Sequence, residues 1–199
     1  DSIIAGQDAF DWNREFPEIL KNGGFDIVIG NPPYGAKFKN AEKEHLKNLY
    51  ESYEYQGNSY PLFIEKGVEL LNKSGYLGYI TPATFTNQLY YSKIRNLLSR
   101  YKIMAVTKYM YKVFNNAETG DTVSFILKNE MSKKDNTINI TLIPSKKFNE
   151  RTITNIDQTN FINENGTFNL TTIDLNKFYK NSEKLSEICE SITAGIKPY

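Results

Sequence analysis

Apolar residues recur along this chain in short runs that alternate with segments of helical spacing. Runs at 25–30, 76–82, 104–107 and 122–127 are rich in Ile, Val, Leu and aromatic residues, as expected for buried strands. Between them, residues 59–73 and 87–101 space their apolar side chains as amphipathic helices do. Strands that alternate with helices favour an α/β fold with a doubly wound sheet.

The pattern changes after residue 130. A polar turn is followed at 137–143 by alternating polar and apolar residues, which indicates a strand that we place at the edge of the sheet. From Pro144 onward Asn, Thr and Lys dominate, and residues 184–192 suit one short helix or strand. We therefore divide the chain into a main domain at 1–145 and a C-terminal extension at 146–199.

The tetrapeptide Asn31-Pro32-Pro33-Tyr34 directly follows the apolar run at 25–30. Two prolines remove two backbone N–H donors, so this loop offers carbonyl oxygens, one amide side chain and one aromatic ring. Open α/β sheets place ligand groups in such loops at the carboxyl ends of their strands. A solvent-exposed polyproline-type turn is the alternative interpretation of the same four residues.

This loop suits a planar aromatic amine, whose lone pair is delocalised into its ring. If the Asn31 side-chain oxygen and the Pro32 carbonyl each accept one N–H, the amine nitrogen is drawn towards tetrahedral geometry and becomes a better nucleophile. Tyr34 then supplies a stacking face, worth roughly 1–3 kcal/mol for a base on an aromatic ring.

With its strand and its tetrapeptide, the chain resembles the adenine-N6 DNA methyltransferases of type IIG restriction–modification systems. The resemblance implies S-adenosylmethionine as cofactor, with Asp8, its neighbour Ala9 and Asn31 as cofactor-binding residues. It implies Asn31, Pro32, Pro33 and Tyr34 as catalytic residues, and Phe114 as a second aromatic that packs with Tyr34 against the target base. From the residues alone, Asp8 is equally well a turn or N-cap aspartate, and Phe114 equally well closes a hairpin.

The resemblance covers only the C-terminal half of a Rossmann-like methyltransferase fold, with an antiparallel last strand and a C-terminal extension. The strand and Gly-rich turn with which that fold begins are not found ahead of residue 8. We therefore expect a fragment with an incomplete cofactor pocket that is inactive alone. The resemblance implies a partial methyltransferase domain at 1–145, and a linker with the start of a target-recognition domain at 146–199.

Composition bears on cellular location, metal binding and binding partners. No apolar stretch approaches the ~20 residues of a membrane span, and no export signal opens the chain, so we expect no membrane partner and a cytoplasmic location in a prokaryote. Cys189 and His45 are the only cysteine and histidine, which leaves no zinc cluster and predicts no metal site. A net charge of +1 does not by itself indicate a nucleic-acid partner, and nothing in the sequence indicates an oligomeric state.

The sequence is thus interpreted as a site-specific DNA adenine-N6 methyltransferase whose partner is double-stranded DNA with a flipped adenine. One rival is a methyltransferase for protein glutamine or for RNA, since these enzymes share the tetrapeptide. A rival of another class is a scaffold or interaction fragment that keeps the fold without the activity.

Overall fold

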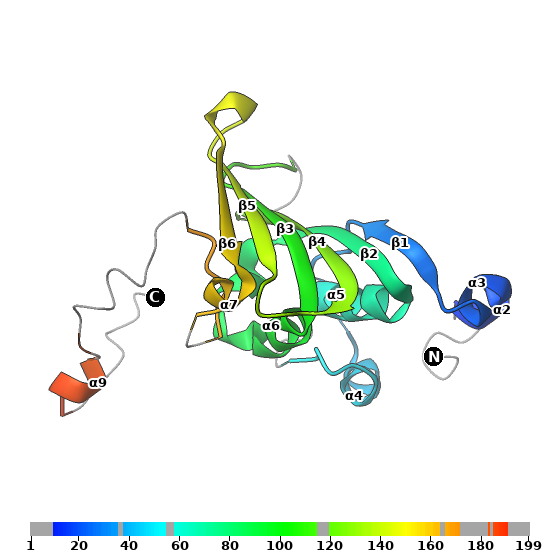
Figure 1. The fold of residues 1–199 in the computed structure, drawn as a ribbon. Helices are drawn as coiled ribbons and strands as arrows, with labels where there is room; N and C mark the ends of the chain where they lie inside the picture. Colours follow the sequence, from blue (N-terminus) through cyan, green and yellow to red (C-terminus); the bar gives the residue numbers. More distant parts are fainter. Residues whose placement is uncertain are drawn as a thin grey trace.

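A six-stranded mixed sheet forms the centre of the computed structural model, which describes residues 10–35, 38–54, 58–114, 120–163, 166–171, 183 and 185–190 (Figure 1). The strands lie in the order β1-β2-β4-β3-β5-β6. Their bounds are β1 (Phe25–Gly30), β2 (Leu71–Pro82), β3 (Tyr101–Tyr109), β4 (Thr122–Met131), β5 (Thr137–Ile143) and β6 (Thr152–Asp157).

Strand direction decides where the loops gather. β1 is parallel to β2, β4 is antiparallel to both β2 and β3, and β3 is parallel to β5. β1, β2, β3 and β5 therefore run the same way, and the loops after them lie along one edge of the sheet. An α/β sheet with antiparallel strands matches the predicted class.

One strand lies elsewhere than predicted. The strand at 137–143 was placed at the edge of the sheet, but β5 pairs with β3 on one side and with β6 on the other. The alternating pattern has another cause: Ile138 and Ile140 are fully buried beneath the helices, while Asn139 and Thr141 face the other side. The alternating pattern reflects a strand whose sheet is covered by helices on one face, not a strand at the edge of the sheet.

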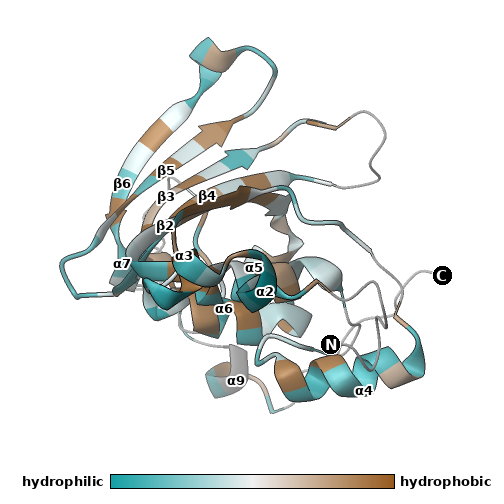
Figure 2. Cartoon of the chain, turned by 90° about the vertical axis from the view of Figure 1, so that its right-hand side faces the viewer, coloured by the Kyte–Doolittle hydropathy of each residue, from teal (hydrophilic) through white to brown (hydrophobic). Residues whose placement is uncertain are grey.

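Helices cover one face of the sheet (Figure 2). α5 (Ser59–Glu69) packs on β2, α6 (Ser92–Ser99) on β3, and α7 (Gln158–Phe161) on β5. Each helix turns its apolar side chains inward, so Ile64, Ile94 and Phe161 are fully buried. The other described helices are α2 (Trp12–Glu15), α3 (Pro17–Lys21), α4 (Asn40–Leu49), α9 (Leu185–Ile188), and the 3-10 turns η2 (Ala83–Thr86), η3 (Leu89–Tyr91) and η4 (Phe148–Glu150).

The opposite face of the sheet carries no helix among the described residues (Figure 2). At its β1 end this face is apolar, since Ile27 and Ile29 are 64% and 78% exposed and lie beside Tyr76 and Gly78 of β2. None of the described helices is long and apolar enough to cross a membrane.

The sheet and its core continue past residue 145, where the sequence was divided. β6 pairs with β5 along its length, and Phe161, Phe168 and Leu170 are buried in the same core as Phe85. The assignment of the remaining residues to a linker and a target-recognition domain stays a prediction.

Candidate active site

The predicted loop lies at the carboxyl edge of the sheet. β1 ends at Gly30, and residues 31–35, which we call the acceptor loop, follow it directly. β2 leaves the sheet beside β1 at the same edge, because the two strands are parallel with Gly30 opposite Tyr79. Clefts at this edge are where open α/β sheets bind their ligands.

Asn31 and Tyr34 are brought into contact within the loop. The Tyr34 hydroxyl lies 2.5 Å from Asn31 Oδ1 and 3.0 Å from the carbonyl oxygen of Ile80 on β2. A hydroxyl has one proton, so Tyr34 donates to only one of these two oxygens at a time. Asn31 is exposed, while its side-chain oxygen is held towards Tyr34.

The Tyr34 ring packs against α5. It meets the ring of Tyr60 edge to face with 6.2 Å between the centroids, and Tyr60 is fully buried. The Tyr60 hydroxyl lies 3.1 Å from Thr84 Oγ1. Partial burial raises the pKa of Tyr34, so its hydroxyl stays protonated at neutral pH and acts as a donor.

The two prolines present their carbonyls differently. The Pro33 carbonyl accepts a hydrogen bond from Ser59 Oγ at 2.6 Å, whereas none of the hydrogen bonds between described residues ends on the Pro32 carbonyl. Pro32 itself is buried and Pro33 is exposed. The loop therefore retains two acceptors near each other in sequence, Asn31 Oδ1 and the Pro32 carbonyl.

Of the predicted site residues outside the acceptor loop, the structure describes only Phe114. Phe114 is half-buried and follows β3, so it lies at the same edge as the acceptor loop, but no ring contact joins it to Tyr34 among the described residues. Asp8 and Ala9 fall outside the described residues. The described part of the chain holds no group of three or more His, Cys, Asp or Glu side chains that suits a metal ion, and Cys189 is exposed.

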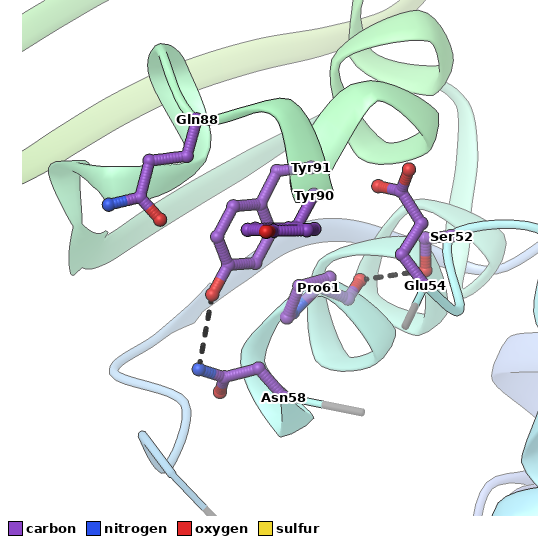
Figure 3. Close-up of a pocket in the computed structure, with 7 residues that line it drawn as sticks. All are labelled: Ser52, Glu54, Asn58, Pro61, Gln88, Tyr90 and Tyr91. Atoms are coloured by element: carbon purple, nitrogen blue, oxygen red, sulfur yellow. Dashed lines mark hydrogen bonds between the residues drawn. The ribbon is translucent and has the colours of Figure 1, made fainter. Parts of the chain in front are cut away.

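A pocket lies next to the acceptor loop, between the start of α5, residues 52–54 and η3 (Figure 3). Its lining includes Asn58, whose Nδ2 donates to the Tyr91 hydroxyl at 3.3 Å and whose Oδ1 accepts the N–H of Gly35 at 3.2 Å. Asn31 and Tyr34 do not line this pocket. Through Asn58 the pocket wall and the loop are held together.

Three groups that hold the loop were not recognised in the sequence: Asn58, Ser59 and the Ile80 carbonyl. Ser59 was assigned only to the beginning of a helix, and Asn58 to the polar stretch ahead of it. A Ser or Asn at a helix start signals a cap, and nothing local to the sequence says that the side chain turns to another loop instead. A backbone carbonyl has no sequence signal at all.

Sequence comparisons relate this chain to known proteins. A model of the Eco57I restriction-modification methylase family matches residues 1–114. The type II restriction enzyme and methyltransferase RM.Eco57I of Escherichia coli is 33% identical over 132 residues, which cover 63% of this chain and 13% of that protein. A type II methyltransferase of Thermus thermophilus is 35% identical over 85 residues, or 38% of this chain and 20% of that protein.

Solved structures share the fold at low sequence identity. The methyltransferase subunit of a type I restriction-modification system from Streptococcus thermophilus matches with a TM-score of 0.51 at 17% identity, over 88% of this chain and 36% of that one. The type IIG restriction endonuclease BpuSI matches with a TM-score of 0.51 at 14% identity, over 67% and 19%. The predicted partial Rossmann-like methyltransferase fold is confirmed. Since the family model spans more than half of its residues, this chain belongs to the Eco57I restriction-modification methylase family.

Proposed function

We propose that this chain carries the target-amine site of a DNA methyltransferase that methylates adenine at N6 within a restriction–modification protein. The observation that supports it is the acceptor loop at the carboxyl edge of the sheet. Among the described residues, the Tyr34 hydroxyl is the one donor to Asn31 Oδ1, no donor binds the Pro32 carbonyl, and the Tyr34 hydroxyl has a second acceptor on Ile80. An amine with two N–H groups matches two such acceptors.

The first four residues of the loop have distinct tasks in this proposal. Asn31 and Pro32 accept the two hydrogens of the amine, which turns its nitrogen lone pair out of the ring plane. Tyr34 stacks on the base, and its hydroxyl turns to the Ile80 carbonyl when the amine takes Asn31 Oδ1. Pro33 stiffens the loop, because its ring fixes φ. The nitrogen loses one proton to solvent after the transfer.

S-adenosylmethionine supplies an electrophilic methyl group when bound. Of the described residues, Asn31 is proposed to bind this cofactor. It is exposed at the end of β1, where this class of sheet opens its ligand crevice. Asp8 and Ala9 are proposed to bind the same cofactor.

Double-stranded DNA is the proposed substrate, and the target adenine has to leave the helix to reach the loop. Unstacking and unpairing a base costs a few kcal/mol, which stacking on Tyr34 and two acceptor bonds offset. Phe114, which follows β3 at the same edge, is proposed as the second stacking face. Relatives named as restriction enzymes and methyltransferases support DNA over the protein and RNA alternatives.

The test is methyl transfer by the full-length protein from tritiated S-adenosylmethionine to unmethylated duplex DNA, with RNA and a glutamine peptide as competing substrates. We expect label in DNA alone, recovered as N6-methyladenine after digestion to nucleosides. Asn31→Ala is expected to lower the rate at least about 100-fold, because it removes one of two groups that orient the nucleophile. Label in RNA or peptide, or a near-normal rate for Asn31→Ala, contradicts the proposal.

A further inference from the structure

The start of α5 contacts the acceptor loop at three consecutive residues. Ser59 Oγ donates to the Pro33 carbonyl at 2.6 Å, the Tyr60 ring supports the Tyr34 ring, and Asn58 Oδ1 accepts the N–H of Gly35 at 3.2 Å. Ser59 is only 1% exposed, so the donor end of its hydrogen bond is shielded from water, although Pro33 is exposed.

Asn58 stands at the N-cap of α5 and does not cap the helix. No side-chain hydrogen bond caps α5 at this position, although Asn is among the best capping residues. Instead, both ends of its amide are used elsewhere, the oxygen on Gly35 and the nitrogen on the hydroxyl of Tyr91 (Figure 3). The residue gives up a stabilising local role to hold the loop.

The loop needs a constraint that its prolines do not supply. The rings fix φ of Pro32 and Pro33, and a following proline confines ψ of Asn31 and Pro32 to the extended region. The first backbone torsion left free is ψ of Pro33. This torsion rotates the Pro33 carbonyl and sets the Tyr34 ring relative to Asn31 and the Pro32 carbonyl. The hydrogen bond from Ser59 to that carbonyl fixes it.

We propose that Ser59 and Asn58 are positioning residues of the methyl-transfer site, which hold the base-stacking Tyr34 in register with the two amine acceptors. This proposal rests on the proposed function, since it assigns a role to residues around the same amine site. Neither residue touches the substrate. Both act through the backbone of the acceptor loop.

Ser59→Ala in the full-length protein tests the first of them. With tritiated S-adenosylmethionine and unmethylated duplex DNA, we expect the single-turnover rate to fall roughly 10- to 100-fold, since a misplacement of about 1 Å costs up to about 100-fold. The KM for S-adenosylmethionine is expected to stay within about three-fold, because the cofactor contacts are unchanged.

Ser52→Ala is the matched control. Ser52 is also buried, at 2% exposure, and its Oγ also donates to a proline carbonyl, that of Pro61 at 3.2 Å (Figure 3). Among the described residues its hydrogen bonds go to Glu65 and Pro61 and none to the acceptor loop. It removes the same chemistry from the same neighbourhood, so a comparable loss of thermal stability is expected with a single-turnover rate within about three-fold of wild type. Equal rate losses in the two variants overturn the positioning role.

A second pair of variants decides the matter if Ser59→Ala does not fold. Asn58→Ala removes both amide bonds and is expected to slow the single-turnover rate roughly ten-fold. Asn58→Asp keeps the acceptor for Gly35 and is expected to recover most of that rate. If Asn31→Ala inactivates the protein but Ser59→Ala or Asn58→Ala keeps the wild-type rate, this inference alone is overturned. Activity in Asn31→Ala overturns the proposed function itself.

Discussion

At the scale of single residues, the hydroxyl of Tyr34 connects the acceptor loop to the sheet. Its one proton faces two oxygens, Asn31 Oδ1 at 2.5 Å and the Ile80 carbonyl at 3.0 Å. While it binds Asn31, it fixes which end of the Asn31 amide faces the ring. When a substrate amine takes that oxygen, the hydroxyl retains a partner on β2, so no buried donor is left unsatisfied.

Tyr34→Phe separates this hydroxyl from the stacking ring. We expect DNA binding to stay within about three-fold, because the ring remains, and the single-turnover rate of the full-length protein to fall about five- to ten-fold, the equivalent of about 1 kcal/mol of lost orientation. Rates with excess enzyme and DNA affinity by fluorescence anisotropy measure the two effects. Tyr109→Phe is the matched control, since its hydroxyl lies 3.3 Å from Ser124 Oγ on strands β3 and β4. A Tyr34→Phe enzyme with the wild-type rate contradicts this role.

The residues of the loop itself follow from the sequence, because a strand, two prolines and an aromatic are adjacent in the chain. The residues that hold the loop do not. Asn58, Ser59 and Ile80 lie 23, 26 and 46 positions from their partners in the loop. Such contacts depend on how α5 and β2 dock, which no local pattern of apolar residues encodes.

At the scale of elements, the start of β1 is anchored to the chain just ahead of β2. The chain leaves α3 through Gly23 and Gly24, both with positive φ, and the N–H of Phe25 donates to the Leu70 carbonyl at 2.8 Å. This contact anchors the start of β1 beside β2. The register shifts between Phe25 and Ile27, and the strand then ends with Gly30 opposite Tyr79.

Gly24→Ala is expected to disturb that contact. A Cβ at Gly24 lies 2.5 Å from the Leu70 carbonyl oxygen and 2.8 Å from the backbone of Asn72, whereas a Cβ at Gly23 meets nothing within 4 Å. Both substitutions carry strain of about 1–3 kcal/mol from positive φ. Only Gly24→Ala adds a backbone clash, worth about another 1–3 kcal/mol. Urea unfolding of the two variants measures the difference, and equal midpoints contradict the argument.

For β1 to β5, local sequence predicts where each one lies in the chain but not their order in the sheet. The apolar runs located β1 to β4 and the alternating pattern located β5. Burial explains the composition of β2 and β4, whereas β1 is apolar although Ile27 and Ile29 are exposed. Their order is another matter: β4 lies between β2 and β3 although it follows both in the sequence. The alternation in β5 indicated that one face is covered, and says nothing about which strands lie on either side.

At the scale of the whole molecule, aromatic side chains link the site to the core. Tyr34 contacts Tyr60, Tyr60 contacts Phe85, and Phe85 contacts both Phe125 on β4 and Phe168. The core under the acceptor loop therefore includes buried phenol groups as well as hydrocarbon. A buried phenol favours its neutral form, because the charged form is poorly solvated.

This composition predicts a loss of stability in alkali. Burial raises the pKa of Tyr60, of Tyr79 and of Tyr34 above the ordinary value of 10.0. Below pH 10 these phenols are protonated in both the folded and the unfolded chain, and the full free energy of unfolding is present. Above pH 10 the unfolded chain loses the protons and the folded chain keeps them, so the free energy of unfolding falls as pH rises towards the raised pKa values.

Tyr60 is fully buried and contributes most to the pH dependence. Urea titrations of the 199-residue chain between about pH 8 and 11 are expected to lose about 1.4 kcal/mol per pH unit above pH 10 for this residue. Tyr60→Phe removes the ionisable group, so its curve is expected to fall less steeply whatever its stability at pH 8. Phe85→Leu is the control, because it disturbs the neighbouring ring without removing a titratable group, and should keep the wild-type slope. The same slope in Tyr60→Phe and wild type contradicts the assignment of this pH dependence to Tyr60.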